Sequence, residues 1–206
     1  MVQIFQNQQL PIEFAVAGHP MKGESVSGDG YVVRPTARGT LLAVVDGAGH
    51  GDAAAKAAKM ATSIMEQHTD APLISILEFC HVALKETRGA VMTVAALDEE
   101  QKTLTWLGVG NVEGRLCRAD RSRQAEQLTL GAGVVGYQIP QLRPVVTSIS
   151  LGDMLILTTD GIESEYSTLG FLNQPPLYVA EQILKRFSKG TDDAMVLAAR
   201  YTGVRP

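Results

Sequence analysis

Short apolar runs, separated by polar and glycine-rich connections, dominate the chain. Residues 40–46 (TLLAVVD) are apolar up to a final aspartate and are bounded by glycine, which predicts a strand buried on both faces. Runs at 12–18, 30–33 and 154–159, and the closing TDDAMVLAARY, predict further strands. In the middle of the chain AVMTVAALD, TLTWLGVG and VEGRLCRA are separated by EEQK and by Asn111, a pattern typical of antiparallel hairpins.

Three other segments have helical character. Asp52 stands in a capping position before AAAKAAKMATSIMEQH, which is rich in helix-forming residues. Residues 72–87 carry apolar side chains at helical spacing behind Pro72, and a last helix is expected over 177–187. Two helices inserted among many strands do not fit a parallel alternation of strands and helices. The pattern therefore predicts a layered α+β domain with largely antiparallel sheets.

The composition is that of an ordinary globular protein. A single domain over residues 1–206 is the natural expectation at this length. Cys80 and Cys117 lack metal-ligand spacing and are expected to be reduced core thiols. The amino terminus lacks the pattern of a signal peptide, and no apolar run is long enough to cross a membrane, so a cytoplasmic location is expected.

The charge pattern argues against a nucleic-acid-binding protein. The net charge is −4, and the basic residues are scattered rather than gathered on one segment. The strongest basic cluster is RLCRADRSR, with Arg115, Arg118, Arg121 and Arg123. Because it lies where two strand-like segments need a turn, it is expected to be a solvated hairpin tip.

Aspartates recur where apolar strands end in glycine-rich or polar turns. They are Asp29 in SGDGY, Asp46 in VVDGAGHG, Asp160 in LTTDGIES, and Asp192 and Asp193 in GTDDAMVL. Any one of these sites alone is ordinary turn chemistry. If the strand ends meet in space, however, their carboxylates repel one another unless cations neutralise them. Carboxylate oxygens are hard ligands, so the four motifs together predict a Mg²⁺ or Mn²⁺ centre rather than a zinc site.

Other catalytic motifs fit poorly. Gly108, Gly110 and Gly114 miss the spacing of a dinucleotide-binding loop, and a strand rather than a helix is expected to follow them. No phosphate-binding loop of the nucleotide triphosphatases occurs. The single histidine of GHGD has no obvious base and nucleophile partners for covalent catalysis.

In order and spacing, GDGY, DGAGHG, TDGIES and TDDAMVL resemble the metal-binding motifs of the protein phosphatase 2C superfamily, the metal-dependent Ser/Thr phosphatases. The intervening GAVMTVAALDEEQKTLTWLGVGNVEGRLCR resembles that family's central hairpin, so the likeness covers nearly the whole chain. The compact length and the DGAGHG form are similar to the bacterial SpoIIE-type branch. This resemblance implies a β-sandwich of two mainly antiparallel sheets flanked by helices, with two metal ions, Mn²⁺ or Mg²⁺, at one edge.

The resemblance also assigns roles to residues of this chain. Asp46 would bridge the two ions, and the Gly47 carbonyl would bind one of them. Asp160 and Asp192 would complete the shell of the other ion, and Asp29 would act directly or through a coordinated water. Asp193, a weaker candidate, matches a position that the family fills with Asn or Asp. A metal-bound hydroxide would then attack the phosphorus of a phosphoserine or phosphothreonine.

The chain departs from the family at two positions. Many eukaryotic members have a histidine directly after the Asp-Gly pair, where it has been assigned as the general acid. This chain has Ala48 there, and His50 follows two residues later. His50 is therefore a candidate general acid, and a turn histidine packed on the helix start is the competing interpretation. Arg34 is close in sequence to the first motif but cannot be equated with the family's phosphate-binding arginine.

The same resemblance implies partners. The expected substrates are phosphorylated scaffold proteins of a stress-signalling complex, the stressosome, or proteins of an anti-sigma pathway. Neither nucleic acid nor membrane is an expected partner, and the oligomeric state stays open. Two alternatives compete with the protein phosphatase: a pseudophosphatase that binds phosphoproteins without hydrolysing them, and a metal-dependent hydrolase of small phosphate esters.

Overall fold

Two antiparallel β-sheets packed face to face form the body of the protein. The structure is a computed structural model and describes residues 2–5, 10–120, 122–166 and 173–203. One sheet has the order β1-β2-β11-β10-β7-β8, and the other has the order β3-β4-β5-β6-β9. All strand pairs of both sheets are antiparallel, which confirms the α+β sandwich expected from the sequence. The strands of the first sheet are β1 (Val2–Phe5), β2 (Ile12–His19), β7 (Glu113–Cys117), β8 (Glu126–Gln127), β10 (Met154–Thr158) and β11 (Ala194–Tyr201). Those of the second are β3 (Asp29–Pro35), β4 (Gly39–Gly47), β5 (Ala90–Asp98), β6 (Thr103–Val109) and β9 (Val145–Ser148).

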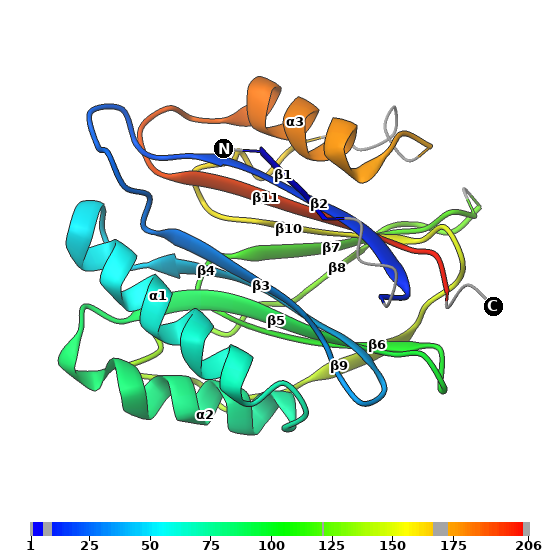
Figure 1. Ribbon diagram of the computed structural model, residues 1–206, viewed down its shortest axis with the longest axis horizontal. Coiled ribbons are helices and arrows are strands. Elements are labelled where there is room, and N and C mark those ends of the chain that lie inside the picture. The colour runs from blue at the N-terminus through cyan, green and yellow to red at the C-terminus, as the bar shows by residue number, and fades with distance from the viewer. Residues whose placement is uncertain (1, 6–9, 121, 167–172, 204–206) are drawn as a thin grey trace.

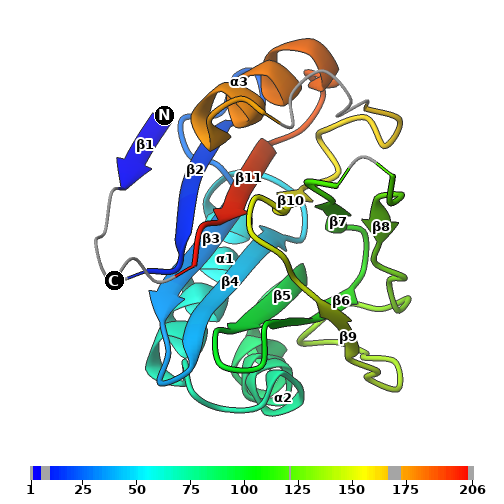
Figure 2. The same ribbon diagram turned by 90° about the vertical axis from the view of Figure 1, so that its right-hand side faces the viewer.

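Helices cover the outer faces of the sandwich (Figures 1 and 2). The helices α1 (Gly51–Gln67) and α2 (Leu73–Ala83) lie on the five-stranded sheet, and α2 continues into the 3-10 turn η1 (Leu84–Glu86). The helix α3 (Pro176–Phe187) lies on β2 and β11 of the six-stranded sheet. Within the described part of the chain, no helix combines the length and the apolar character that crossing a bilayer requires.

The hydrophobic core is divided by the two sheets into three layers. The central layer lies between the sheets and includes Trp106, and the two outer layers lie under the helices. Strand β4 serves two of these layers: Leu42 and Val44 face the other sheet, whereas Leu41 and Val45 face α1 and α2. The alternation follows from the pleat of a strand. It confirms that the apolar run ending at Asp46 is buried on both faces.

Helix ends differ in detail from the sequence-based expectation. Helix α1 begins at Gly51 with His50 as its N-cap residue, and no side chain caps it. Asp52 is therefore not the cap. It lies in the first turn, where its negative charge is favoured by the helix dipole. Regular α2 ends at Ala83 rather than at residue 87, because the chain tightens into the 3-10 turn there.

The basic segment at 115–123 is not a solvated tip throughout. The Arg118 side chain is fully buried and forms ion pairs with Asp153 and Glu126. Arg115 lies over the Tyr166 ring, 4.3 Å from its centroid, and donates to the Tyr166 carbonyl. The solvated-tip expectation was wrong for these two residues because their partners follow much later in the chain. Arg121 lies outside the described residues, and Arg123 is exposed.

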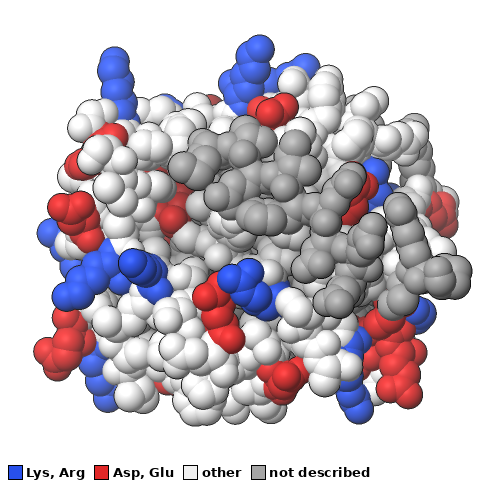
Figure 3. Space-filling view, in the orientation of Figure 1, with Lys and Arg blue, Asp and Glu red and all other residues white. Residues whose placement is uncertain are grey.

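Two other expectations from composition can be compared with the structure. Cys80 and Cys117 are both buried and free, as predicted. On the face shown in Figure 3, basic and acidic side chains are interspersed, without a large area of one sign. This distribution agrees with the scattered basic residues of the sequence.

Candidate metal centre

Asp29 and Asp46 face each other across the β3–β4 pair. They are direct partners in the register, Asp29 at the start of β3 and Asp46 near the end of β4. Directly opposite residues of an antiparallel pair have Cβ atoms about 4.5–5.5 Å apart and share one face of the sheet. The strand pairing therefore places two carboxylates side by side at one end of the sandwich.

The six-stranded sheet brings two more acidic groups to the same end of the sandwich. Asp160 follows the end of β10, and Asp192 precedes the start of β11. Across the sandwich, β10 contacts β4 and β11 contacts β3. Thr159 joins the two sheets directly: its hydroxyl donates to Asp29 Oδ2 at 2.9 Å and accepts from the Met195 amide at 2.8 Å. The four carboxylates of Asp29, Asp46, Asp160 and Asp192, named here the strand-end aspartates, thus come together from four loop or strand ends.

The electrostatics of this end are unfavourable for fully ionised carboxylates. Burial, followed by the charge of Asp46, raises the pKa of Asp29 from 3.8 to about 8. Burial, followed by the charges of Asp160 and Asp192, raises the pKa of Asp46 to about 8 as well. The pKa of Asp160 is also raised, by burial and then by Asp192. Among the described residues, none of the strand-end aspartates takes part in an ion pair. Lys189 acts against the shift at Asp160 but does not offset burial and the charge of Asp192, so the cluster is not free to ionise fully.

Asp193 has a different environment from its neighbour. It is buried, Oδ1 accepts from the Met21 amide, and Oδ2 accepts from the Gly28 amide, both at 2.8 Å. These bonds fasten the polar loop between β2 and β3 to the start of β11. The structure thus gives Asp193 an anchoring contact through each oxygen, whereas its role as a metal ligand stays a prediction.

Gly47 is required by close packing. A Cβ at this position would lie 2.1 Å from the Ala54 carbonyl oxygen of α1, which no side chain could tolerate. The Gly47 amide donates to the Gly28 carbonyl at 3.0 Å, so the turn is held on both sides. Glycine here lets α1 approach the strand end that carries Asp46. That the Gly47 carbonyl binds an ion stays a prediction.

His50 and Arg34 do not point into the aspartate cluster as ligands. His50 Nδ1 lies 2.8 Å from Glu24 Oε1, and the histidine side chain is half exposed at the start of α1. Arg34 lies at the far end of β3 from Asp29 and pairs with Glu66 of α1. The Glu24 contact favours a structural position for His50, and general-acid catalysis by His50 stays a prediction.

Asn111 contacts the strand-end aspartates, although the sequence did not identify it as a site residue. Its Nδ2 donates to Asp160 Oδ2 at 2.8 Å and so orients that carboxylate. Lys189 Nζ donates to the Asp160 carbonyl at 2.6 Å. In the sequence Asn111 looked only like the turn between two strands. The sequence feature that could have identified it is its position: Asn111 is a polar residue just after a strand end, as the strand-end aspartates are.

The chemistry of these side chains fits a hard divalent cation. Asp29 Oδ1 is buried and has no hydrogen-bond partner among the described residues, although a buried carboxylate oxygen normally has one. Within the part of the chain that the structure describes, no three acidic, histidine or cysteine side chains are already arranged around one point. Mg²⁺ retains several waters and uses only one or two carboxylates, so it does not need such a set. The strand-end aspartates therefore fit magnesium or manganese.

An antiparallel sandwich covered by helices, with aspartates gathered at one end of the sheets, is the fold of the protein phosphatase 2C class. Within this class the chain belongs to the SpoIIE family, because residues 36–202 match the family described as "Stage II sporulation protein E (SpoIIE)". It is also 30% identical over 162 residues to the phosphoserine phosphatase RsbX of Bacillus subtilis strain 168, covering 79% of each chain. The resemblance to the SpoIIE-type branch that was stated from the sequence is thereby confirmed.

Solved structures support the same assignment. A chain from a study of the bacterial stressosome is 29% identical, with a TM-score of 0.86 over 92% of this chain and 99% of that one. RsbX in complex with magnesium has a TM-score of 0.86 at 22% identity, covering 98% of this chain and all of that one. The catalytic domain of the phosphatase PstP, which holds two manganese ions, has a TM-score of 0.71 at 17% identity, covering 93% and 98% of the two chains. The last two likenesses concern the fold.

Proposed function

We propose that this protein is a metal-dependent protein serine/threonine phosphatase that hydrolyses phosphoserine or phosphothreonine on regulatory partner proteins. The observation that carries the proposal is the group of four strand-end aspartates, of which two have their pKa raised to about 8 and none has an ion-pair partner among the described residues. A protein that only binds phosphoproteins gains nothing from such mutual repulsion. A metal-dependent phosphatase does gain, because closely spaced carboxylates bind the divalent cations that it needs.

Asp46, Asp160, Asp192 and Asp29 would hold the ions, with Mg²⁺ or Mn²⁺ as the candidates and two ions expected. When bound, such ions activate water as a nucleophile and neutralise the charge of the phosphoryl group. Magnesium in the RsbX structure and two manganese ions in the PstP structure support this choice of metal. Asp193, with both oxygens bonded to backbone amides, serves mainly to hold the loop before Asp29.

The protein's own contribution is to fix the carboxylates in place. Thr159 holds Asp29 through a 2.9 Å hydrogen bond, and Asn111 holds Asp160 through one of 2.8 Å. Outer contacts of this kind orient metal ligands, and losing one typically costs about 10- to 100-fold in metal affinity or activity. In phosphoryl transfer, positioning and charge neutralisation supply most of the rate acceleration. The two hydrogen bonds are therefore part of the proposed catalytic apparatus.

The substrate class follows from the relatives. RsbX is named as a phosphoserine phosphatase, and the stressosome study concerns a signalling assembly. We infer by similarity that the substrates of this protein are phosphorylated scaffold proteins of a stressosome-like complex. Specificity would then depend on the surface around the metal centre as well as on the phosphate.

The test is phosphate release from a phosphothreonine peptide with Mn²⁺, with Mg²⁺ and with EDTA, run beside Asp160→Asn. The proposal predicts release that requires the metal and is lost in the variant. Full activity of Asp160→Asn with unchanged metal dependence would refute the site. Folded, metal-loaded protein that releases no phosphate, even from a phosphorylated stressosome scaffold, would support the pseudophosphatase.

A further inference from the structure

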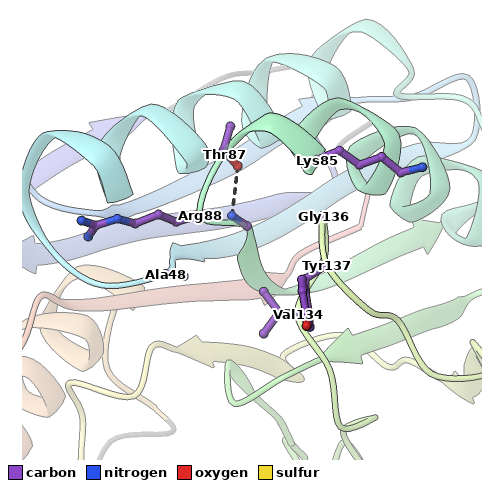
Figure 4. Close-up of a pocket in the computed structure, with 8 residues that line it drawn as sticks. Ala48, Lys85, Thr87, Arg88, Val134, Gly136 and Tyr137 are labelled. Carbon is purple, nitrogen blue, oxygen red and sulfur yellow. Dashed lines mark hydrogen bonds between the residues drawn. The ribbon is translucent and has the colours of Figure 1, made fainter.

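A pocket of about 280 Å³ lies immediately beside the loop that follows Asp46 and Gly47 (Figure 4). One wall is Ala48 of that loop, and the others come from the η1–β5 turn and from the turn at 134–137. The volume is near the lower end of the range for ligand sites, which suits one or two side chains of a larger ligand. The lining includes Ala48, Lys85, Arg88, Val134 and Tyr137.

Arg88 is held close to the metal-centre loop. The Ala48 amide donates to the Gly89 carbonyl at 3.0 Å, which ties the loop to the residue after Arg88. A Cβ on Gly49 would lie 2.9 Å from Arg88 Nη1, so the guanidinium lies across the backbone of that glycine. Figure 4 shows Arg88 extending toward the Ala48 side of the pocket, whereas Lys85 extends away on the opposite side.

Both cations are exposed and uncompensated. Among the described residues, no side chain forms an ion pair with Arg88 or Lys85, in contrast to Arg34, Arg38 and Arg118, which all have acidic partners. Where the strand-end aspartates are ionised and not neutralised by a cation, their charge is a barrier to an anionic substrate. Cations at the border of that site lower this barrier and attract negative groups.

The remaining wall offers a rigid aromatic contact. The Tyr137 side chain is 85% exposed, yet its backbone is fixed by a 3.0 Å hydrogen bond from its amide to the Val134 carbonyl. The turn is bonded to β5 through Ala90 and Val135, and the Gly136 amide donates to His81 Nδ1. Exposed tyrosine and arginine on a fixed backbone are the residue types that dominate binding energy in protein interfaces.

We propose that this pocket binds the part of the phosphoprotein substrate that flanks the phosphorylated residue. Arg88, beside the metal-centre loop, binds an acidic side chain of that segment, Lys85 adds positive charge on the opposite side of the pocket, and Tyr137 and Val134 contact its apolar parts. The inference rests on the proposed phosphatase function and adds to it a substrate class: phosphorylated segments with an acidic residue close to the phosphosite. Charge complementarity is the argument for this occupant.

The experiment measures metal-dependent hydrolysis of phosphothreonine peptides in which one aspartate is moved through the three positions on either side of the phosphosite. A peptide with glutamine in its place and para-nitrophenyl phosphate are the reference substrates. Arg88→Ala, Lys85→Ala and Arg88→Glu are compared with Arg38→Ala, a matched control on the β3–β4 hairpin at the opposite end of those strands.

For the wild-type protein we expect a preference for an aspartate at one position. Arg88→Ala should raise KM for that peptide about fivefold to tenfold, the size of one charge-assisted contact at a surface, with little change in kcat. Arg88→Glu should reverse the preference, and Lys85→Ala should have a smaller effect than Arg88→Ala. Arg38→Ala should behave as wild type.

Two results would overturn the inference. The first is a wild-type enzyme with no preference for acidic neighbours. The second is an equal loss toward para-nitrophenyl phosphate in Arg88→Ala, because that small ester has no flanking segment and Arg88 would then bind the transferred phosphate itself.

If the wild type hydrolyses nothing, the proposed function has failed rather than the pocket. Fluorescence anisotropy of a labelled acidic peptide with wild type and Arg88→Glu then decides the pocket alone, and equal affinities would refute it.

Discussion

Two groups of carboxylates in this protein have opposite surroundings. Around Arg118, Asp153 accepts from the guanidinium at 2.7 Å and from the amides of Ala119 and Ser150, and Glu126 also pairs with the arginine. At the strand-end aspartates, Asp29 and Asp46 are pushed toward neutrality, with pKa values of about 8, and Asp29 Oδ1 has no partner among the described residues.

The difference separates a group of charges with a structural role from a group with a proposed functional role. The Arg118 cluster compensates its charges within the fold, so its role is complete without any ligand. The strand-end aspartates carry an electrostatic cost that the described part of the fold leaves uncompensated. Such uncompensated, pKa-shifted groups are typical of functional sites. The contrast can be tested by breaking each group in turn.

Removing the cation of the compensated cluster should have the largest effect on stability. Arg118→Met leaves Asp153 buried without its charge partner, and breaking a buried pair in this way costs about 3–5 kcal/mol. Urea unfolding followed by circular dichroism measures it. If Arg118→Met remains folded, its phosphatase activity should still depend on Mn²⁺. A loss below about 1 kcal/mol would mean that the Arg118 cluster is not structural.

Removing a charge from the strand-end aspartates should instead reduce activity without reducing stability. Asp46→Asn is expected to lower kcat/KM for a phosphopeptide by about 100- to 1000-fold, as losing one electrostatic group of a catalytic site does. At the same time it relieves the repulsion of Asp46 by Asp160 and Asp192, so the melting temperature of the metal-free protein at pH 8 should not fall. A variant that is both active and destabilised would contradict this assignment.

A smaller loss is expected at Asn111, which touches Asp160 without being an acidic ligand. Asn111→Ala should reduce metal affinity or activity by about 10- to 100-fold, the range for residues that orient metal ligands. Asn111→Asp is the informative partner variant, because it places another carboxylate against Asp160 and should lower activity at least as far as Asn111→Ala at the same Mn²⁺ concentration. Wild-type activity in Asn111→Ala would remove Asn111 from the site.

Stability of the metal-free protein should depend on pH through the same cluster. Asp29 and Asp46 have folded-state pKa values of about 8 against 3.8 when unperturbed, so between these values the folded state holds more protons than the unfolded state. The contribution of Asp29 and Asp46 to stability therefore falls as pH rises from about 4 to about 8. We expect the melting temperature in EDTA to fall over that range by about 2–4 °C for each kcal/mol lost, and Mg²⁺ to flatten the dependence. The same slope with and without metal would refute the linkage.

The smallest effect is expected at His50. Because His50 contacts Glu24 at the start of α1, His50→Ala should change kcat less than about threefold. Glu24→Gln is the matched control for that contact. A loss of about 100-fold or more in kcat, together with loss of the basic limb of the pH–rate profile, would instead identify His50 as the general acid.

The sequence predicted the fold well because its information is local. Apolar runs bounded by glycine located β4 within one residue at each end, and antiparallel hairpins followed from short connections. The approach of Asp29 to Asp46 was predictable because sheet pairing brings together aspartates at the ends of neighbouring strands, whereas their role as metal ligands stays a prediction. The contacts of Asn111 with Asp160 and of Arg118 with Asp153 were not predictable, since they join residues 49 and 35 positions apart. Likewise, only the packed structure shows that Asp193 uses both oxygens on backbone amides.

The most direct test of the central claim is metal binding by the strand-end aspartates themselves. Isothermal titration calorimetry of Mn²⁺ into wild-type protein, Asp46→Asn and the surface control Arg38→Ala measures it without any substrate. We predict binding to wild type and Arg38→Ala that releases protons near pH 7, and strongly weakened binding to Asp46→Asn. Equal binding to all three proteins, or no binding to folded wild type, would contradict the assignment of a metal centre.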